Sequence, residues 1–371
     1  MMDETIIPVL ELRKFVEAVF LKAGVPQQDA AICADVLIAS DLRGIESHGI
    51  SRLKMYYDRI KAGIQIPATR IDVIRDGPTT AVWDGNHGMG QVIGYRAMES
   101  AIEKAGKYGM GSVAVRNSTH YGIAGYYPLM AVRAGMIGMS VTNTRPSIAP
   151  TFGIKPLLGT NPIAFGAPTD MECPFLFDAA TSIIQRGKVE IYARKDKSLP
   201  DGWVIDRDGQ FAHNPQQILK ELTEDTNALL PLGGLGEEFS GHKGYGLATI
   251  VEILSSALQT GAFLHGLTGF DSTGKKQPFK IGHFFMAIQI ESFLPLDEFK
   301  KNIGDLLREL RDSPKAAGEN QIYLAGEKEF ENEKRIIHAG IPVSPSLQNE
   351  LKMIQSELQL FDYPLPFQVH S

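Results

Sequence analysis

A histidine, an arginine and a tyrosine recur four residues apart near the start of the chain. They are His48, Arg52 and Tyr56 of the segment SHGISRLKMYY, and we expect a helix here from about Gly49 to Ala62. Residues four apart lie along one face of a helix. Arginine binds carboxylates through two parallel hydrogen bonds, histidine changes charge near neutral pH, and a phenol hydroxyl can donate a hydrogen bond. The row therefore suits the binding and protonation of a small acid, although a solvated helix face has the same spacing.

Two further residues could complete such a site. Ser47 stands at the start of this helix, where it or His48 could cap the first turn. His120 follows a predicted strand at residues 111–117, and α/β proteins bind ligands beyond the ends of strands. A single histidine in a turn is also a common structural residue. The sequence thus offers two histidines as candidates for proton transfer.

A glycine-rich segment, GHKGYGLATIVEIL, predicts a helix that begins near residue 241. Its apolar residues follow the helical period: Leu247, Ile250, Val251, Leu254 and Leu258. Lys243 lies in the first turn, where free backbone N–H groups and the positive end of the helix dipole favour an anion. The segment therefore predicts a phosphate site, with a glycine-rich loop and a solvated lysine as the alternative.

Three other glycines, Gly88, Gly90 and Gly94, follow a predicted strand and open a helix. Their spacing is G-x-G-x-x-x-G, whereas the Rossmann fingerprint is G-x-G-x-x-G with an acidic residue after the next strand. Arg116 and Asn117 stand at that strand end instead. The pattern favours a plain glycine-rich turn over a Rossmann dinucleotide site.

Composition narrows the class of protein. The chain has 371 residues and a net charge of −6 without a basic block, which gives no support for binding to nucleic acid or to a membrane surface. No apolar run approaches the roughly eighteen residues of a membrane span. Cys33 and Cys173 lie far apart, so we expect neither a disulfide framework nor a cysteine metal site, and we expect a cytoplasmic protein. Zinc, nucleotide-hydrolase and serine-hydrolase motifs are absent from the sequence.

Periodicity predicts an α/β core between helical ends. Helices are expected at about 8–24, 26–44, 90–108, 241–261, 297–312, from 328 and from 344. Strands are expected at 71–76, 79–85, 111–117, 135–143, 174–182, 283–290 and 321–327. The segment 144–169 is rich in proline and glycine and lacks a period, which indicates a functional loop.

Five segments in this order resemble the malate/L-lactate dehydrogenase family of the non-Rossmann type. They are SHGISRLKMYY, NSTHYGIAGYY, LLGTNPIAFGAP, FDAATS and PLGGLGEEFSGHKGYGLATIVEIL, and the resemblance covers about residues 8–345. It implies a three-layer α/β fold with a mixed seven-stranded sheet, like L-sulfolactate dehydrogenase, and usually a homodimer. The expected parts are a helical N-terminal part (1–75) packed with C-terminal helices (296–371), and a core (76–295) whose cofactor portion is about 138–262.

The resemblance also implies roles for individual residues. Ser47, His48, Arg52 and Tyr56 match the substrate-side motif. His120 matches the histidine that acts as acid and base in some members, whereas others use the position of His48. NAD, or alternatively NADP, would be bound by Thr144, Asn161, Pro162, Asp178, Ala179, Ala180, Lys243, Gly326 and Glu327. No metal is implied.

The expected reaction is the reversible oxidation of a 2-hydroxy acid to a 2-oxo acid, with malate and oxaloacetate as the best guess. Arg52 would hold the carboxylate with help from Tyr56 or Ser47. We expect His120 rather than His48 to transfer the proton, because a helix N-terminus disfavours a positively charged imidazole. The alternatives are a reductase of a keto-sugar acid or a cyclic imine acid on the same fold, and a non-catalytic protein that binds a carboxylate or a nucleotide.

Overall fold

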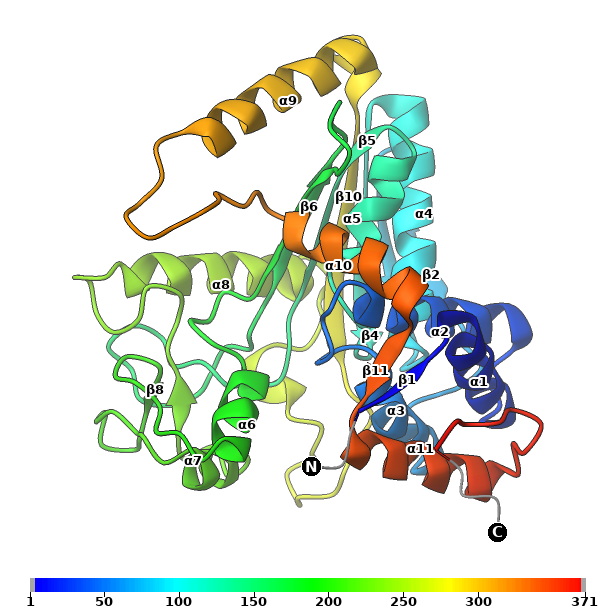
Figure 1. The fold of residues 1–371 in the computed structure, drawn as a ribbon, viewed down its shortest axis with the longest axis vertical. Helices are drawn as coiled ribbons and strands as arrows, with labels where there is room; N and C mark the ends of the chain where they lie inside the picture. The colour runs from blue at the N-terminus through cyan, green and yellow to red at the C-terminus, as the bar shows by residue number, and fades with distance from the viewer. Residues whose placement is uncertain (1–3, 368–371) are drawn as a thin grey trace.

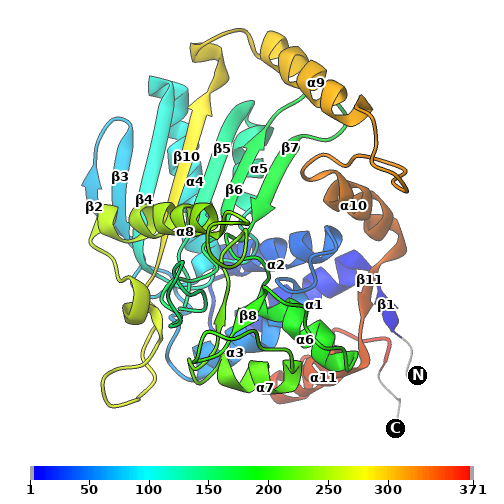
Figure 2. The ribbon, with the colours of Figure 1, turned by 90° about the vertical axis from the view of Figure 1, so that its left-hand side faces the viewer.

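The structure, a computed structural model, describes residues 4–367 and is built around a seven-stranded sheet (Figures 1 and 2). Its strands are β2 (Asp72–Asp76), β3 (Thr80–Asp84), β4 (Met110–Ser118), β5 (Met136–Thr142), β6 (Ile163–Ala167), β7 (Phe175–Ala179) and β10 (Ile281–Gln289). In the order β2-β3-β4-β10-β5-β6-β7, β3 and β4 are parallel and each other neighbouring pair is antiparallel. The mixed seven-stranded sheet is confirmed.

Helices cover both faces of this sheet. The α-helices are α1 (Val9–Lys22), α2 (Gln27–Leu42), α3 (Leu53–Lys61), α4 (Gly90–Tyr108), α5 (Tyr126–Arg133), α6 (Arg186–Arg194), α7 (Pro215–Glu221), α8 (Gly241–Ser255), α9 (Leu296–Asp312), α10 (Glu327–Ala339) and α11 (Pro345–Leu358). Helices α4 and α5 pack on one face, and α8 crosses the other (Figure 2). Short 3-10 turns are η1 (Ile50–Arg52), η2 (Ala257–Gln259), η3 (Leu264–Leu267) and η4 (Ile290–Ser292). Within residues 4–367, no helix is both long and apolar enough to cross a membrane.

The core beneath α4 follows from its apolar spacing. Val92, Ile93, Ala97, Met98 and Ala101 are fully buried, and they recur every three or four residues along one stripe of the helix. Most of them pack with side chains of β4 and β10 in one hydrophobic cluster. Burial of each large apolar side chain contributes about 1.5–3 kcal/mol, so this stripe fixes α4 on the central strands.

A helical part combines both ends of the chain. Helices α1, α2 and α3 pack with α10 and α11, and the short strands β1 (Thr5–Ile7) and β11 (Ile341–Val343) pair antiparallel. Helix α9 lies at the opposite end of the sheet, where Arg308 pairs with Asp170 (Figure 1). The division into residues 1–75, 76–295 and 296–371 stays a prediction, and residues 1–3 and 368–371 of it lie outside the described residues.

A small lobe, residues 183–230, contains α6, α7 and the strands β8 (Val204–Ile205) and β9 (Ala228–Leu229). Its own hydrophobic cluster includes Val189, Val204 and Ile218. We call it the α6–α7 lobe. It stands beside the helical part, below α8 in Figure 1.

Two expectations about secondary structure were wrong. Residues 321–327 form no strand, because Leu324 N–H binds the Glu327 side chain and Gly326 has a positive φ of 85°, which turns the chain into α10. The predicted loop 144–169 contains β6, whose short apolar run between prolines and glycines carries no clear period. The expected strand at 174–182 is present as β7, which is the edge strand of the sheet, and its Phe177 side chain is exposed.

Candidate active site

The segment before α3 is held by a carboxylate that sequence analysis missed. The chain makes the 3-10 turn η1 before it enters α3, and Asp41 Oδ2 accepts the Ile50 N–H at 2.8 Å. Asp41 therefore caps this turn, and the expectation that Ser47 or His48 does so was wrong. The Ser47 hydroxyl instead lies 2.8 Å from His48 Nδ1. With the backbone already capped, Ser47 and His48 are available for other contacts.

His48, Tyr56 and His120 meet in space. The Tyr56 hydroxyl lies 2.5 Å from His120 Nδ1, and the ring of His120 stacks on that of His48 with centroids 5.4 Å apart. Tyr56 is 0% exposed, so its hydroxyl faces His120 and not open space. The structure thus brings together two predicted proton-transfer residues and gives Tyr56 a contact that differs from the expected one with a substrate carboxylate.

Both histidines are neutral at neutral pH. Burial and, to a smaller extent, the nearby charge of Arg52 lower the pKa of His48 to about 4. Burial also holds the pKa of His120 well below its usual value, with additional effects from His48, Arg59 and Arg52. Both rings keep part of their surface accessible but are closely surrounded by protein. The helix-terminus argument therefore does not separate the two histidines, because burial depresses the pKa of each.

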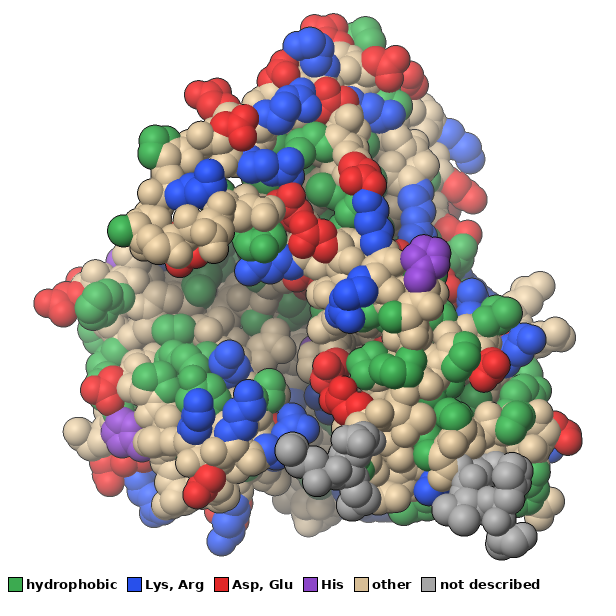
Figure 3. All heavy atoms as spheres, in the orientation of Figure 1, with side chains coloured by type: hydrophobic (Ala, Val, Ile, Leu, Met, Phe, Trp, Pro, Cys, Tyr) green, Lys and Arg blue, Asp and Glu red, His purple; other side chains and the backbone are tan. Residues whose placement is uncertain are grey.

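Arg52 and Ser47 line one wall of a cavity of about 780 Å³. Arg52 Nε donates to the Ser47 carbonyl at 2.5 Å, and its terminal nitrogens have no hydrogen-bond or ion-pair partner within residues 4–367. Lys188, Arg194 and Trp203 of the α6–α7 lobe line the other wall. Figure 3 shows the surface hollowed between this lobe and the helical part. Four glutamates line the cavity as well, so its lining is mixed in charge, and an anionic ligand fits beside the unpaired terminal nitrogens of Arg52.

The glycines before α4 bring its first turn against the backbone of the His120 loop. A Cβ at Gly90 would collide with the carbonyl oxygens of Thr119 and His120. The Thr119 hydroxyl accepts the Gly90 N–H at 3.0 Å and donates to the Gly88 carbonyl at 2.8 Å. These glycines therefore allow two protein segments to approach closely and position His120.

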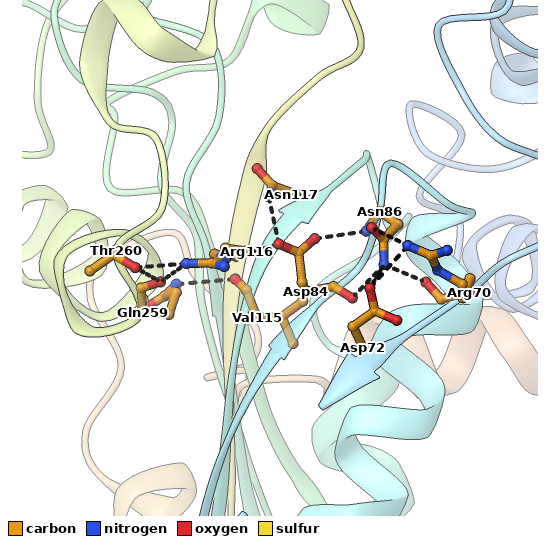
Figure 4. Close-up of polar contacts among 9 residues, drawn as sticks. All are labelled: Arg70, Asp72, Asp84, Asn86, Val115, Arg116, Asn117, Gln259 and Thr260. Atoms are coloured by element: carbon orange, nitrogen blue, oxygen red, sulfur yellow. Dashed lines mark hydrogen bonds and ion pairs between the residues drawn. The ribbon is translucent and has the colours of Figure 1, made fainter. Parts of the chain in front are cut away.

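Arg116 and Asn117 belong to a polar network next to this loop (Figure 4). Arg116 donates to Asp84 at 2.9 Å and to the Thr260 hydroxyl at 2.8 Å, and Asn117 donates to Asp84 at 2.8 Å. Burial alone would raise the pKa of Asp84, but hydrogen bonds from Asn86, Arg116 and Asn117 outweigh it and lower the pKa. The network ties the ends of β3 and β4 to the turn after α8, which fixes the strand end that precedes His120.

Three of the predicted cofactor residues, Thr144, Asn161 and Pro162, lie together on the face of the sheet covered by α8. Asn161 Nδ2 donates to the Ala248 carbonyl at 3.0 Å and to Glu252 at 2.8 Å, while its Oδ1 accepts the Thr144 N–H at 3.3 Å. Pro162 follows and leads into β6. The buried Glu252, which sequence analysis missed, thereby joins α8 to both loops.

Asp178 connects the end of β7 with the His120 loop. Its Oδ2 accepts the Gly125 N–H at 2.7 Å. Asp178 is exposed, yet desolvation by the surrounding protein raises its pKa to about 6, and the Gly125 hydrogen bond opposes the shift. Ala179 and Ala180 follow with half-buried side chains, which leaves their backbone approachable. This strand end is therefore tied to the loop that follows His120.

The last three predicted cofactor residues differ in whether they already have contacts within the protein. They are Lys243, Gly326 and Glu327. Lys243 lies exposed in the first turn of α8 without a side-chain partner in the described chain. Glu327 pairs with Arg311 at 2.5 Å and accepts the Leu324 N–H at 2.9 Å, so it fastens the start of α10. Gly326 packs against Leu176 of β7, where a Cβ would collide. An unpaired lysine at a helix N-terminus fits the phosphates of a nicotinamide dinucleotide.

Arg59 is a further residue that sequence analysis missed. It lies three residues after Tyr56 and seven after Arg52, a spacing that places all three on one helix face and could have revealed it. Its guanidinium lies 4.3 Å from the centroid of the Phe279 ring.

Comparison with known proteins identifies the family of the chain. Residues 7–352 match the malate/L-lactate dehydrogenase family. The chain belongs to this family. Its members are dehydrogenases, and the family resemblance seen in the sequence is confirmed.

Relatives of this malate/L-lactate dehydrogenase family member include a malate dehydrogenase from Pyrococcus abyssi, 48% identical over 94% of this chain and 93% of that one. An L-sulfolactate dehydrogenase from Methanocaldococcus jannaschii is 39% identical over 94% of this chain and 96% of that one. The crystal structure of malate dehydrogenase from Entamoeba histolytica has a TM-score of 0.94 and 44% identity, and covers 98% of this chain and 100% of that one. The predicted fold is therefore confirmed by a solved relative.

Proposed function

We propose that the protein is an NAD- or NADP-dependent oxidoreductase that interconverts a 2-hydroxy acid and a 2-oxo acid, with malate and oxaloacetate as the best candidates. The observation that carries the proposal is the contact of the Tyr56 hydroxyl with His120, beside His48 and the unpaired terminal nitrogens of Arg52. Relatives named malate dehydrogenase and L-sulfolactate dehydrogenase support the substrate class.

Arg52 binds the carboxylate next to the reacting carbon. Its Nε is occupied by the Ser47 carbonyl, which orients the planar guanidinium and leaves the terminal nitrogens for the acid. Ser47 lines the same cavity and can donate a hydrogen bond to the acid. Two charged hydrogen bonds would stabilise the bound acid by about 1.5–3 kcal/mol each.

His120 moves the proton. A hydroxyl group both donates and accepts, so Tyr56 can hold Nδ1 in either protonation state of the ring and leaves Nε2 for the substrate. In oxidation, neutral His120 accepts the substrate hydroxyl proton at Nε2; in reduction, the protonated ring returns it to the carbonyl oxygen. The neighbouring His48, also neutral, can donate an N–H hydrogen bond to the same oxygen.

The cofactor, when bound, accepts or supplies the hydride at its nicotinamide ring. Lys243 and the first turn of α8 would hold its phosphates. The backbone of Asp178, Ala179 and Ala180 lies beside the His120 loop and would hold the part nearest the reacting carbon. Thr144, Asn161, Pro162, Gly326 and Glu327 would shape the remaining walls.

We further propose a homodimer in the cytoplasm. Helix α8 exposes Leu247, Ile250 and Ile253, and Leu258 follows with half its surface exposed, so an apolar strip lies uncovered beside the proposed cofactor residues. Two buried free cysteines, Cys33 and Cys173, fit a reducing compartment. Light scattering would test the dimer, and Ile250→Glu should favour the monomer.

The experiment that tests the reaction is a rate assay of purified protein with NADH or NADPH and a panel of acids: oxaloacetate, sulfopyruvate, a keto-sugar acid and a cyclic imine acid. We expect oxaloacetate or sulfopyruvate to oxidise the cofactor fastest. Preference for the sugar or imine acid would favour the reductase alternative. Tight cofactor binding without turnover of any acid would indicate a non-catalytic binding protein and contradict the proposal.

A further inference from the structure

Arg59 lies on the face of α3 that points to the proton-transfer residues. Tyr56, one turn earlier, contacts His120 through its hydroxyl. Arg59 follows at a spacing of three residues, which keeps its side chain beside that of Tyr56. The guanidinium is fixed from one side by Phe279, whose ring centroid lies 4.3 Å away in the segment before β10.

This arginine has no acidic partner. Its Nη1 is buried without a hydrogen bond, and no ion pair of Arg59 occurs within residues 4–367. Other arginines with largely buried side chains are paired: Arg43 with Glu333 at 2.9 Å, Arg116 with Asp84 at 2.9 Å and Arg311 with Glu327 at 2.5 Å. A buried charge without a counter-charge is unfavourable, so the site lacks an anion at Arg59.

The charge of Arg59 acts on the site itself. Its positive charge, like that of Arg52, contributes to the low pKa of His120. Burial lowers the pKa of Arg59, and the nearby positive charge of Arg52 lowers it further. Arg52 in η1 and Arg59 in α3 both lack an anionic partner within residues 4–367, so together they offer a site for two negative charges.

We propose that Arg59 binds the second anionic group of the substrate, and so makes the enzyme selective for dianionic 2-hydroxy acids. Arg52 holds the carboxylate beside the hydroxyl carbon, and Arg59 holds the distal carboxylate or sulfonate. The inference rests on the proposed function. A substrate anion at this position would give the buried Arg59 Nη1 a partner without any acidic side chain having to move toward it.

The test compares two acids of similar length that differ in the distal charge, L-malate and (S)-2-hydroxybutyrate. In Arg59→Gln, the ratio of kcat/KM for malate to kcat/KM for hydroxybutyrate should fall by about 10- to 100-fold, the usual effect of a lost charged hydrogen bond. Arg59→Lys, which keeps the charge, should recover part of the ratio. Arg75→Gln, at an exposed arginine on β2, is the matched control and should leave the ratio unchanged.

Four outcomes would overturn the inference. Equal losses for both acids would mean that Arg59 acts only by supporting Tyr56 and His120. An unchanged ratio in Arg59→Gln, or a parent enzyme that prefers hydroxybutyrate, would also reject the distal role while the dehydrogenase function stands. A parent enzyme that oxidises neither acid would contradict the proposed function first. If circular dichroism shows that Arg59→Gln does not fold, the same ratio of kcat/KM values is measured for Arg59→Lys. That ratio should then be lower than in the parent enzyme.

Discussion

The hydroxyl oxygen of Tyr56 lies 2.5 Å from Nδ1 of His120, although 64 residues separate them in the chain. Histidines that transfer protons are commonly held through one ring nitrogen so that the other faces the reactant. Here a buried phenol on α3 does this for a histidine that follows β4. The helical part and the sheet therefore both contribute to the proposed catalytic site.

Tyr56→Phe should lower kcat/KM for the 2-hydroxy acid by roughly tenfold, because the ring keeps its packing while His120 loses the group that orients Nδ1. The pH at which His120 titrates in the kcat/KM profile should shift as well. The KM for the cofactor should stay near that of the parent. An unchanged profile would show that the hydroxyl plays only a structural part.

The pH dependence of the two directions should differ. Oxidation needs neutral His120, and its depressed pKa means that the neutral form already predominates at pH 7. The kcat/KM for oxidation should therefore be flat around neutral pH and fall only well below about pH 6.5, the ordinary histidine pKa. The kcat/KM for reduction needs the protonated ring and should rise as the pH falls through the same range. A rise of the oxidation rate between pH 7 and 9 would contradict the assignment.

Arg52→Lys should reduce kcat/KM for every 2-oxo acid by about 10- to 100-fold, because a point-charge ammonium cannot reproduce two parallel hydrogen bonds. Unlike substitution of Arg59, it should affect acids with one or two negative charges alike. Steady-state kinetics with pyruvate and oxaloacetate provide the measurement. Retention of full activity would place Arg52 on a merely solvated face.

Lys243→Ala should raise the KM for the nicotinamide cofactor by about tenfold or more, because a charged hydrogen bond to phosphate is lost. The KM for the acid should change little. Lys197→Ala, at an exposed lysine of the α6–α7 lobe, serves as the control and should leave both constants near those of the parent. A raised KM for the acid with normal cofactor binding would move Lys243 to the substrate side.

Much of the fold could be predicted because its signals are local. The stripe Ile93, Ala97 and Ala101 predicts α4, and the segment SHGISRLKMYY predicts α3, although the helix begins at Leu53 and Arg52 lies in the turn before it. The site could be predicted only in part, because its contacts join distant segments. Neither the cap from Asp41 nor the contact of Tyr56 with His120 leaves a local pattern.

The burial of individual side chains could not be predicted from the sequence either. The sequence ranks His48 and His120 by their place relative to a helix terminus, but desolvation lowers the pKa of both. In the sequence, Arg59 looks like any other polar residue of an amphipathic helix. Only the structure shows that no acidic side chain within residues 4–367 pairs with it. Family resemblance supplied the candidate cofactor residues, which local spacing alone would not have grouped.

The most direct test of the proposed chemistry uses L-malate that carries deuterium on the hydroxyl-bearing carbon. The parent enzyme should transfer the deuterium to the oxidised cofactor. His120→Asn should still bind cofactor and malate but transfer the label about 10²–10⁴-fold more slowly, the usual contribution of general acid–base catalysis. His48→Asn should mainly raise the KM for malate. Loss of the label to water, or a His120→Asn rate equal to that of the parent alongside an inactive His48→Asn, would contradict the account.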